Sequence, residues 1–289
     1  MTIATNKDKL VRMAASGQIS PPRFDPRSPY RIGHDGRPRV VPGTGSIAYN
    51  VRVGDRARGI VGDHVEPGVS LRHPDEQANG GLNVLACVGN EAIVASGEAK
   101  GAKGVVTGKH GGIEHVMIDF PLETLDKLQI GDWIQVRGFG TGLAIDAFPE
   151  ILCTNLDPGV LEGWIHEVKD DQLVVPVAKF APAAIMGSGL GRDNVFRGDY
   201  DITLFDPGVV EEYGLDELRL GDFVAILDAD ASYGRYYLKG AISIGIVAHA
   251  DSIIAGHGPG VTGLLTSRDG QILPVLDPKA NLADLLGLR

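Results

Sequence analysis

The chain has 289 residues, of which 43% are hydrophobic, and it carries a formal net charge of −10 at pH 7. A chain of this length can bury a core as one large domain or as two ordinary ones. The charge is spread without a block of like sign, which argues against nonspecific nucleic-acid binding because that requires a basic face. No stretch approaches the ~20 apolar residues of a membrane helix, and the first residues lack a signal-peptide pattern. We therefore expect a cytoplasmic protein with no membrane or nucleic-acid partner.

Glycine is the compositional outlier, with 40 residues, roughly twice the usual ~7%. The glycines punctuate short apolar runs, which suits tight turns, bulges and close approach of backbone to a ligand. The two cysteines, Cys87 and Cys153, both lie in apolar runs and are too few for a disulfide framework. They are interpreted as buried free thiols of a reducing compartment.

The first 44 residues are predicted to form an extended arm, with at most one short helix near residues 8–15. A proline- and arginine-rich run at residues 20–29 should stay extended, because proline restricts its own backbone and that of the preceding residue. The arm is expected to pack on the body or on a neighbouring subunit. A proline-rich recognition motif is the alternative.

From Ser46 onward the chain shows short runs rich in Val and Ile with Gly, Pro or Asp at their ends, a pattern typical of strands. The fold class predicted is mainly β, a glycine-rich barrel-like or sandwich-like body with few short helices. Two β units are expected, over residues 45–155 and 156–289. The predicted strands cover residues 47–53, 83–88, 92–96, 104–107, 114–120, 132–137, 161–168, 172–178, 199–205, 222–227, 236–249, 261–265 and 271–275, and the predicted helices 122–128, 208–213 and 282–286.

One internal repeat suggests a duplication. Residues 125–136 align without gaps to residues 215–226, and each copy has a helical turn, a Gly-Asp pair and then a strand. Asp caps such a turn by accepting from nearby amides while Gly supplies the unusual φ. Independent origin of two common turns is the alternative. If the repeat is real, both copies should follow one backbone path.

Two glycine-histidine motifs carry a family resemblance. Residues 108–112, with the sequence GKHGG, and residues 255–260, with the sequence AGHGPG, resemble the signatures of an uncharacterised prokaryotic family. That family is a domain of unknown function with a separate C-terminal part, and the similarity covers most of the chain after about residue 40. The resemblance implies a mainly-β fold and no established activity, so no catalytic residues are carried over.

The first candidate site is the glycine-rich segment of residues 96–115. Successive amides in such a turn can form an anion-binding concavity to which lysines add charge. An exposed hairpin with solvated lysines is the bland alternative, and the spacing matches neither a Walker loop nor a Rossmann fingerprint. The residues expected to bind a ligand here are Lys100, Gly108, Gly111 and Gly112, with Lys109 and His110 as catalytic candidates.

Histidines supply candidate metal ligands in three places. His110 and His115 lie on a loop that enters a strand, His64 lies in an Asp-His-Val-Glu turn, and His257 is flanked by glycines. A polar surface turn is the alternative for His64, and a histidine bonded to a backbone carbonyl is the alternative near His257. A divalent metal of unknown identity is the cofactor expected.

The end of the longest apolar stretch offers a third candidate site. His249 and Asp251 share strand parity there, and Gly256 and Gly258 give a ligand close access to His257. Asp251 is expected to be catalytic, and Gly256 and Gly258 to bind the ligand. We further expect this segment to meet the glycine-rich segment of residues 100–115 in space, since a site needs groups that converge from different elements.

These features favour a small-molecule enzyme, most plausibly a metal-dependent hydrolase or lyase acting on an anionic substrate. The alternative is a nonenzymatic oligomeric protein that binds an anionic metabolite through its glycine-rich loop. In both cases the partner is a small molecule, and the proline-rich arm favours a homo-oligomer.

Overall fold

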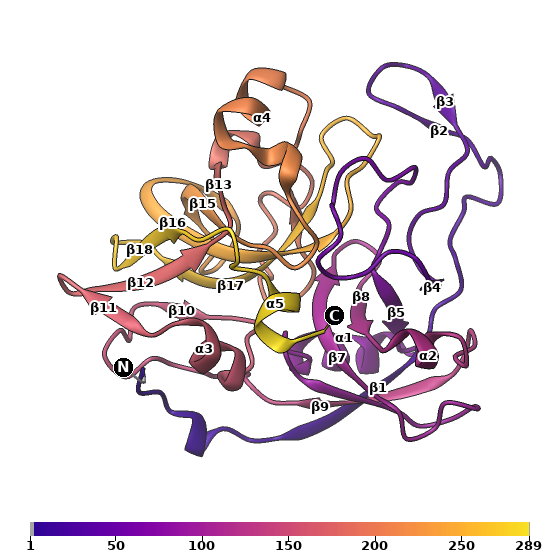
Figure 1. The fold of residues 1–289 in the computed structure, drawn as a ribbon, viewed down its shortest axis with the longest axis horizontal. Coiled ribbons are helices and arrows are strands. Elements are labelled where there is room, and N and C mark those ends of the chain that lie inside the picture. Colours follow the sequence, from indigo (N-terminus) through magenta and orange to yellow (C-terminus); the bar gives the residue numbers. More distant parts are fainter. Residues whose placement is uncertain (1–2, 289) are drawn as a thin grey trace.

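The computed structural model describes residues 3–288 and is mainly β, with a few short helices, as predicted (Figure 1). Two β bodies lie side by side. One is built from the strands of the first half of the chain and the other from those of the second half.

The first body is a closed barrel of six strands. Its strands run in the order β1-β9-β6-β7-β8-β5. The ring closes because β1 pairs antiparallel with β5, where Gln18 of β1 lies opposite Arg72 of β5. Apolar residues from all six strands fill the interior. The strands are β1 (Met13–Ile19), β5 (Gly68–Arg72), β6 (Glu91–Val94), β7 (Lys103–His110), β8 (His115–Asp119) and β9 (Trp133–Gly138), and β4 (Ile47–Ala48) is attached to β5. The helices α1 (Glu76–Leu85) and α2 (Leu122–Leu125) add Leu82 and Leu125 to the core of the barrel.

The second body holds a six-stranded sheet and a three-stranded sheet. In the larger sheet the order is β10-β17-β16-β15-β13, and β14 also pairs with β17. Its strands are β10 (Leu152–Cys153), β13 (Lys179–Pro182), β14 (Tyr200–Asp201), β15 (Phe223–Asp230), β16 (Tyr236–His249) and β17 (Gly260–Ser267). The smaller sheet consists of β11 (Glu167–Lys169), β12 (Gln172–Val177) and β18 (Ile272–Leu276). The helices of this half are α3 (Pro158–Trp164), α4 (Pro207–Tyr213) and α5 (Leu282–Leu286), with short 3₁₀ turns at Lys7–Lys9, Ala183–Ile185 and Leu215–Glu217.

The two bodies meet where β7 of the barrel lies against β16 and β17. The Thr262 hydroxyl accepts from the Lys109 amide at 2.9 Å and lies 3.1 Å from the Lys109 carbonyl, to which it donates. Gly108 lies against Ala248, and a Cβ at Gly108 would come within 2.7 Å of the Ala248 methyl. This contact aligns the ends of β7 and β16, and the candidate site forms at those ends.

A long connection also joins the bodies. Residues 51–66 precede β5 in the barrel, yet Val51, Ala57 and Val65 pack into the core of the second body. Backbone bonds hold this connection there, including those from the Ala57 amide to the Leu218 carbonyl at 2.8 Å and from the His64 amide to the Asp251 carbonyl at 3.1 Å. The connection therefore carries residues 63–66 into the junction between the two bodies.

The two Gly-Asp turns follow the same hydrogen-bond pattern, which confirms the prediction made from the repeat. In the barrel, Asp132 Oδ2 accepts from the Gln129 amide at 2.9 Å, and in the second body Asp222 Oδ2 accepts from the Arg219 amide at 2.8 Å. The glycine before each Asp has a φ near +90°, and each Asp leads directly into a strand, β9 or β15. The backbone partners of the two turns also correspond. The Ile19 amide donates to the Asp132 carbonyl in the first turn, and the Val247 amide donates to the Asp222 carbonyl in the second.

Three predicted elements are wrong. The helix expected near residues 8–15 is replaced by a single 3₁₀ turn and by β1, which lies entirely within the predicted arm and pairs with β9. The first half of the strand expected at residues 83–88 is the end of α1, which begins where Asp75 accepts from the Ala78 amide at 2.8 Å. The first half of the strand expected at residues 161–168 is the end of α3, which Asp157 caps and which has Pro158 in its first turn, whereas its last two residues begin β11.

The rest of the arm crosses the surface and ends in a hairpin of β2 (Arg31–Ile32) and β3 (Pro38–Arg39), which projects from the molecule at the upper right of Figure 1.

The two cysteines are buried free thiols, as predicted. No helix in residues 3–288 is long and apolar enough to span a membrane. The boundaries predicted between arm and β units stay a prediction.

Candidate metal centre

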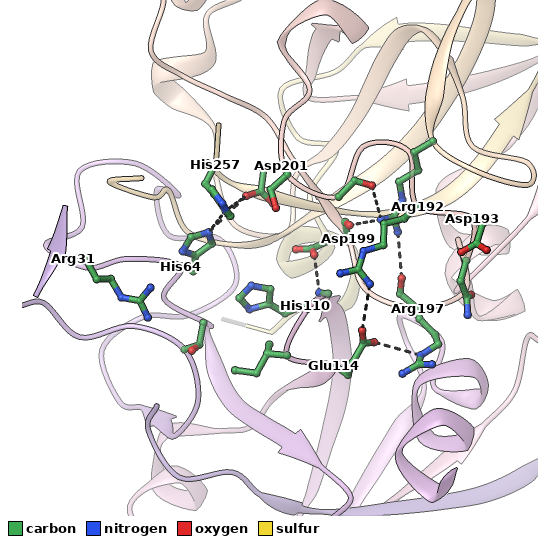
Figure 2. Close-up of a pocket in the computed structure, with 18 residues that line it drawn as sticks. Arg31, His64, His110, Glu114, Arg192, Asp193, Arg197, Asp199, Asp201 and His257 are labelled. Carbon is green, nitrogen blue, oxygen red and sulfur yellow. Dashed lines mark hydrogen bonds and ion pairs between the residues drawn. The ribbon is translucent and has the colours of Figure 1, made fainter. Parts of the chain in front are cut away.

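Five of the chain's eight histidines gather at the junction of the two β bodies. The five are His64, His110, His115, His249 and His257. Of these, His64, His110 and His257 line a cavity of about 460 Å³, which Asp199 and Asp201 of the second body also line (Figure 2).

Each of these side chains reaches the junction from a different place in the fold. His110 ends β7 and His115 begins β8, across a tight turn in the barrel. His249 ends β16, and His257 follows in the loop to β17. His64 comes from the long connection and has a φ of 57°, a left-handed conformation that is uncommon for a residue with a side chain.

His64, Asp201 and His257 form a first set of donors, termed the outer set here. His64 Nε2 lies 3.0 Å from His257 Nδ1 and 3.6 Å from Asp201 Oδ2, and His257 Nδ1 lies 3.3 Å from the same oxygen. Bonds of about 2.0–2.1 Å in a tetrahedral metal site place ligand atoms about 3.3–3.4 Å apart. The outer set therefore has the spacing that a small divalent cation requires.

Asp63 fixes the orientation of the His64 ring. Its Nδ1 lies 3.1 Å from Asp63 Oδ1, and Asp63 is held in turn by the Ser252 hydroxyl at 2.7 Å and by Arg31 at 3.1 Å. Burial raises the pKa of Asp63, but the bonds from His64 and Ser252 outweigh it and bring that pKa to about 2. The ionised carboxylate keeps the Nδ1 proton on His64 and turns Nε2 toward the other donors, as carboxylates behind metal-bound histidines do.

His110, Asp199 and His249 form a second group, termed the inner set, whose donor atoms all lie within 4.8 Å of one another. His249 Nε2 lies 2.8 Å from Asp199 Oδ2, and its ring centroid is 4.1 Å from that of His110. Burial disfavours a charge on His249, but Asp199 outweighs it and raises the pKa of His249 to about 9. Burial and the neighbouring charge of His249 lower the pKa of His110.

Glu66 is the anchor behind the inner set. It is fully buried and accepts from His110 Nδ1 at 2.5 Å, from His115 Nδ1 at 2.8 Å, and from the Ser70 hydroxyl and the Gly45 amide. Burial works against the carboxylate, yet the two histidines hold the pKa of Glu66 well below its usual range. His115 therefore contacts Glu66 rather than the cavity.

The wall opposite the outer set carries arginines (Figure 2). Arg192 and Arg197 lie 3.9 and 3.3 Å from the carboxylate of Glu114, and Arg235 donates to the backbone carbonyls of Asp199 and Arg197. The cavity thus has an end rich in nitrogen and carboxylate donors and an end rich in guanidinium groups. Such a wall suits an anionic ligand, since guanidinium groups match carboxylates and phosphates in shape and charge.

The predicted meeting of the two glycine-histidine segments is confirmed. His110 and His257 line one cavity, and both rings lie within 6 Å of the His64 ring. Gly111 and Gly112 also line the cavity, and the Gly111 amide donates to Asp199 Oδ1 at 2.7 Å. Of the histidines predicted as metal ligands, His64, His110 and His257 belong to the two sets.

Other predicted site residues lie elsewhere. Lys100 is exposed in a turn, and Asp251 lies 3.6 Å from Arg58, on the far side of the connection. Gly108 packs on β16, and Gly256 is an exposed turn residue with a φ of 77°. Gly258 contributes a structural contact, because its amide lies 3.2 Å from Asp201 Oδ2 and a Cβ there would meet the Ile202 carbonyl at 1.8 Å.

Lys109 points away from the cavity, because it alternates with His110 along β7. Its amine is buried and donates to Asn155 Oδ1 at 2.5 Å and to the Phe196 carbonyl at 2.9 Å. Burial lowers the pKa of Lys109 to about 8. Lys109, which is predicted to be catalytic, therefore lies outside the cavity and contacts the junction of the two bodies.

The lowered pKa of Lys109 makes the free energy of unfolding depend on pH. An unfolded lysine titrates near 10.4, so between pH 8 and about 10.4 the unfolded chain holds a proton at Lys109 that the folded chain has lost. The contribution of Lys109 to the free energy of unfolding should therefore increase with pH across this window and be least favourable below pH 8. We expect the difference in urea-unfolding free energy between wild type and Lys109→Met to grow by a few kcal/mol from pH 7.5 to 10. A difference independent of pH would contradict the shift.

Sequence reasoning missed the two aspartates. Asp199 and Asp201 lie on one face of a predicted strand with one residue between them, and both are buried against histidines. An alternating Asp-x-Asp pair in an otherwise apolar strand was the available signal. The segments that hold Asp63 and His249 are predicted as candidate sites, but the sequence does not assign these two residues as anchor or ligand.

Comparisons with known proteins identify a family. Residues 30–162 match the family model described as "Domain of unknown function (DUF4438), N-terminal", and residues 164–286 match its C-terminal counterpart. The chain belongs to this family, which confirms the predicted resemblance. No curated protein matches the chain. A solved structure described as "Crystal structure of TM1086" is similar, with 46% identity, a TM-score of 0.93 and coverage of 98% of this chain and 99% of that one.

Proposed function

We propose that the protein is a metal-dependent hydrolase or lyase that acts on a small anionic substrate. The observation that carries this proposal is the outer set, His64, Asp201 and His257, whose donor atoms lie 3.0–3.6 Å apart. Two histidines and one carboxylate with an open side are a common ligand set for a catalytic divalent metal. The metal would polarise a carbonyl or phosphoryl oxygen of the substrate or supply hydroxide.

The arginine wall supports the anionic character of the substrate. Arg192 and Arg197 reach the cavity from the loop before β14 and currently share Glu114. A carboxylate or phosphate group of a substrate can take the place of Glu114 between them, while the reacting bond lies toward the outer set. The length of the cavity, from donors to arginines, thus orients a small molecule with one anionic end.

Metal analysis of the purified protein tests the proposal. We expect at least one divalent transition-metal ion per chain, and His257→Gln should lower the metal content by about one ion because it removes a donor of the outer set. His34→Gln is the matched control, since His34 is exposed and packs on Phe205 away from both sets. Metal-free protein that takes up no Zn²⁺, Co²⁺ or Mn²⁺ in calorimetry would contradict the proposal.

A rival proposal is nonenzymatic binding of an anionic metabolite, for which the arginine wall is the supporting observation. The two are separated by turnover of a panel of small carboxylate and phosphate compounds with the metal-loaded protein. Turnover that disappears in His257→Gln supports the enzyme. Saturable binding of an anion by metal-free protein, without turnover by the loaded form, supports the binder.

Self-association is proposed from the arm. The β2–β3 hairpin projects from the body with Tyr30, Ile32 and Val40 more than half exposed, while Arg31 of the same hairpin lines the cavity. A second subunit that covers this apolar surface would also fix Arg31. We expect light scattering at micromolar concentration to give at least a dimer, and the triple change Tyr30→Ser, Ile32→Ser and Val40→Ser to give a monomer. A wild-type monomer would contradict the prediction.

A further inference from the structure

We propose that the inner set, His110, Asp199 and His249, holds a second divalent metal ion, and that Asp201 bridges it to the ion in the outer set. The centre would then be dinuclear. This inference rests on the proposed function for its first metal, and it adds a second site and a bridging ligand.

The contacts of the two ring nitrogens of His249 support a metal ion in the inner set. His249 Nδ1 lies 2.9 Å from the Ala250 carbonyl, which can only accept, so Nδ1 carries a proton. A neutral ring would then point the lone pair of Nε2 at Asp199 Oδ2, which is 2.8 Å away and also bears lone pairs. Both side chains are buried, so water does not relieve this repulsion. Only a cation between or upon these atoms makes the arrangement favourable, either a proton or a metal ion.

The tautomer of His110 is also fixed by an acceptor at Nδ1. Its Nδ1 faces the buried Glu66 carboxylate at 2.5 Å and therefore donates to it, which leaves Nε2 as the free donor atom. Carboxylates and backbone carbonyls behind the Nδ1 of metal-bound histidines are the usual means of fixing the ring and the tautomer. In the inner set His110 is therefore held by a carboxylate and His249 by a backbone carbonyl.

Asp201 connects the two sets through its two oxygens. Oδ2 lies 3.3 Å from His257 Nδ1 and 3.6 Å from His64 Nε2 in the outer set, whereas Oδ1 lies 3.8 Å from His249 Nε2 in the inner set. The His64 ring is 5.6 Å from the His110 ring and 5.2 Å from the His249 ring. A carboxylate with one oxygen toward each site suits a pair of ions about 3.5–4 Å apart, as in two-metal hydrolases.

The balance of buried charge agrees with two cations. Four carboxylates, those of Asp63, Glu66, Asp199 and Asp201, are buried around the histidines. Among the ion pairs of the described residues, Arg31 is the arginine that reaches them, and it pairs with Asp63. Buried carboxylates are stable when they are paired or coordinate metals. Imidazole and carboxylate donors together favour Zn²⁺, Co²⁺ or Mn²⁺ over Ca²⁺ or Mg²⁺.

Titration of metal-free protein with Zn²⁺ and with Co²⁺, followed by calorimetry and metal analysis, tests the second site. We expect two ions per chain in wild type and in the control His34→Gln, and one ion in His249→Gln and in His257→Gln. One ion in wild type, unchanged in His249→Gln, would overturn the second site and leave the proposed function intact. Uptake of no ion would overturn both.

The bridge has its own measurement, which uses the unmodified protein. Electron paramagnetic resonance of wild type loaded with two Mn²⁺ per chain is expected to show a spin-coupled pair. Two uncoupled Mn²⁺ signals would overturn the bridging role of Asp201. Because this readout needs no substitution in the buried cluster, it remains decisive even if a histidine variant fails to fold.

Discussion

Replacement of Glu66 by glutamine is expected to lower the free energy of unfolding by about 3–5 kcal/mol, because it leaves two buried histidines without their carboxylate partner. The buried Glu66 carboxylate accepts hydrogen bonds from His110, His115, the Ser70 hydroxyl and the Gly45 amide. It also orients the Nε2 atom of His110, so metal affinity at the inner set should fall about 10–100-fold. Urea unfolding and metal titration of the same variant measure the two effects.

The pH dependence of the Glu66 effect follows from its shifted pKa. That pKa is lowered in the folded protein, so the stabilisation by Glu66 is fully present above its ordinary value of 4.5 and is lost as the pH falls toward the folded value. The difference between wild type and Glu66→Gln should therefore be largest near neutral pH. The exposed Glu98 provides a control, since Glu98→Gln should leave both stability and metal affinity unchanged. A Glu66→Gln protein with wild-type stability and affinity would refute its anchoring role.

The second large effect is expected from Gly260→Ala at the start of β17. A Cβ at this position would lie 2.0 Å from Asp199 Oδ2 and 2.2 Å from His249 Nε2. Because both side chains are buried and anchored, the added methyl must displace the donors of the inner set, at a cost of about 1–3 kcal/mol in stability. We expect the protein to bind one metal ion fewer and to lose most of its activity.

Gly263→Ala is the matched control for this substitution. Gly263 lies on the same strand, and the nearest atom to its added Cβ is 3.9 Å away, an ordinary van der Waals contact. The control should therefore retain the metal content and activity of wild type. Equal metal content in Gly260→Ala and Gly263→Ala would show that the space beside Gly260 is not part of a metal site.

The local chemistry of the sequence predicts much of this fold. The long strand at residues 236–249, the helix at residues 282–286 and the pair of Gly-Asp turns all follow from short-range patterns, and the structure has them. The errors arise where one local signal competes with another. Gly80 and Gly81 suggest a turn, yet they lie inside α1, which Asp75 caps and which Asn79 and Asn83 fasten to the Glu114 carbonyl.

The candidate site is only partly predictable, for a physical reason. His64, His110 and His257 stand out because glycines or acidic residues flank them. Asp201 ends the two-residue strand β14, which pairs with β17, and Asp199 directly precedes that strand, so the alternation of the two aspartates is the local signal that they carry. Lys109 and Asp251, which are predicted to be catalytic, do not line the cavity, because strand parity and the course of the long connection decide which side chains enter it. The contact of β7 with the second body and the course of the connection both depend on hydrogen bonds between residues more than 100 positions apart.

The long connection of residues 51–66 has a mechanical consequence. It brings His64 to a cluster in which His110 belongs to the barrel, and Asp201 and His257 belong to the second body. A cation in the outer set would join the connection to the second body, and a cation in the inner set would join the barrel to the second body. Each would be a cross-link between parts of the chain that otherwise meet through noncovalent packing. Its binding free energy adds to the cohesion of the whole molecule, in proportion to the logarithm of the metal concentration above the dissociation constant. Chelation should therefore loosen the two bodies from each other before it unfolds either one, and proteases should then cut first within residues 51–66.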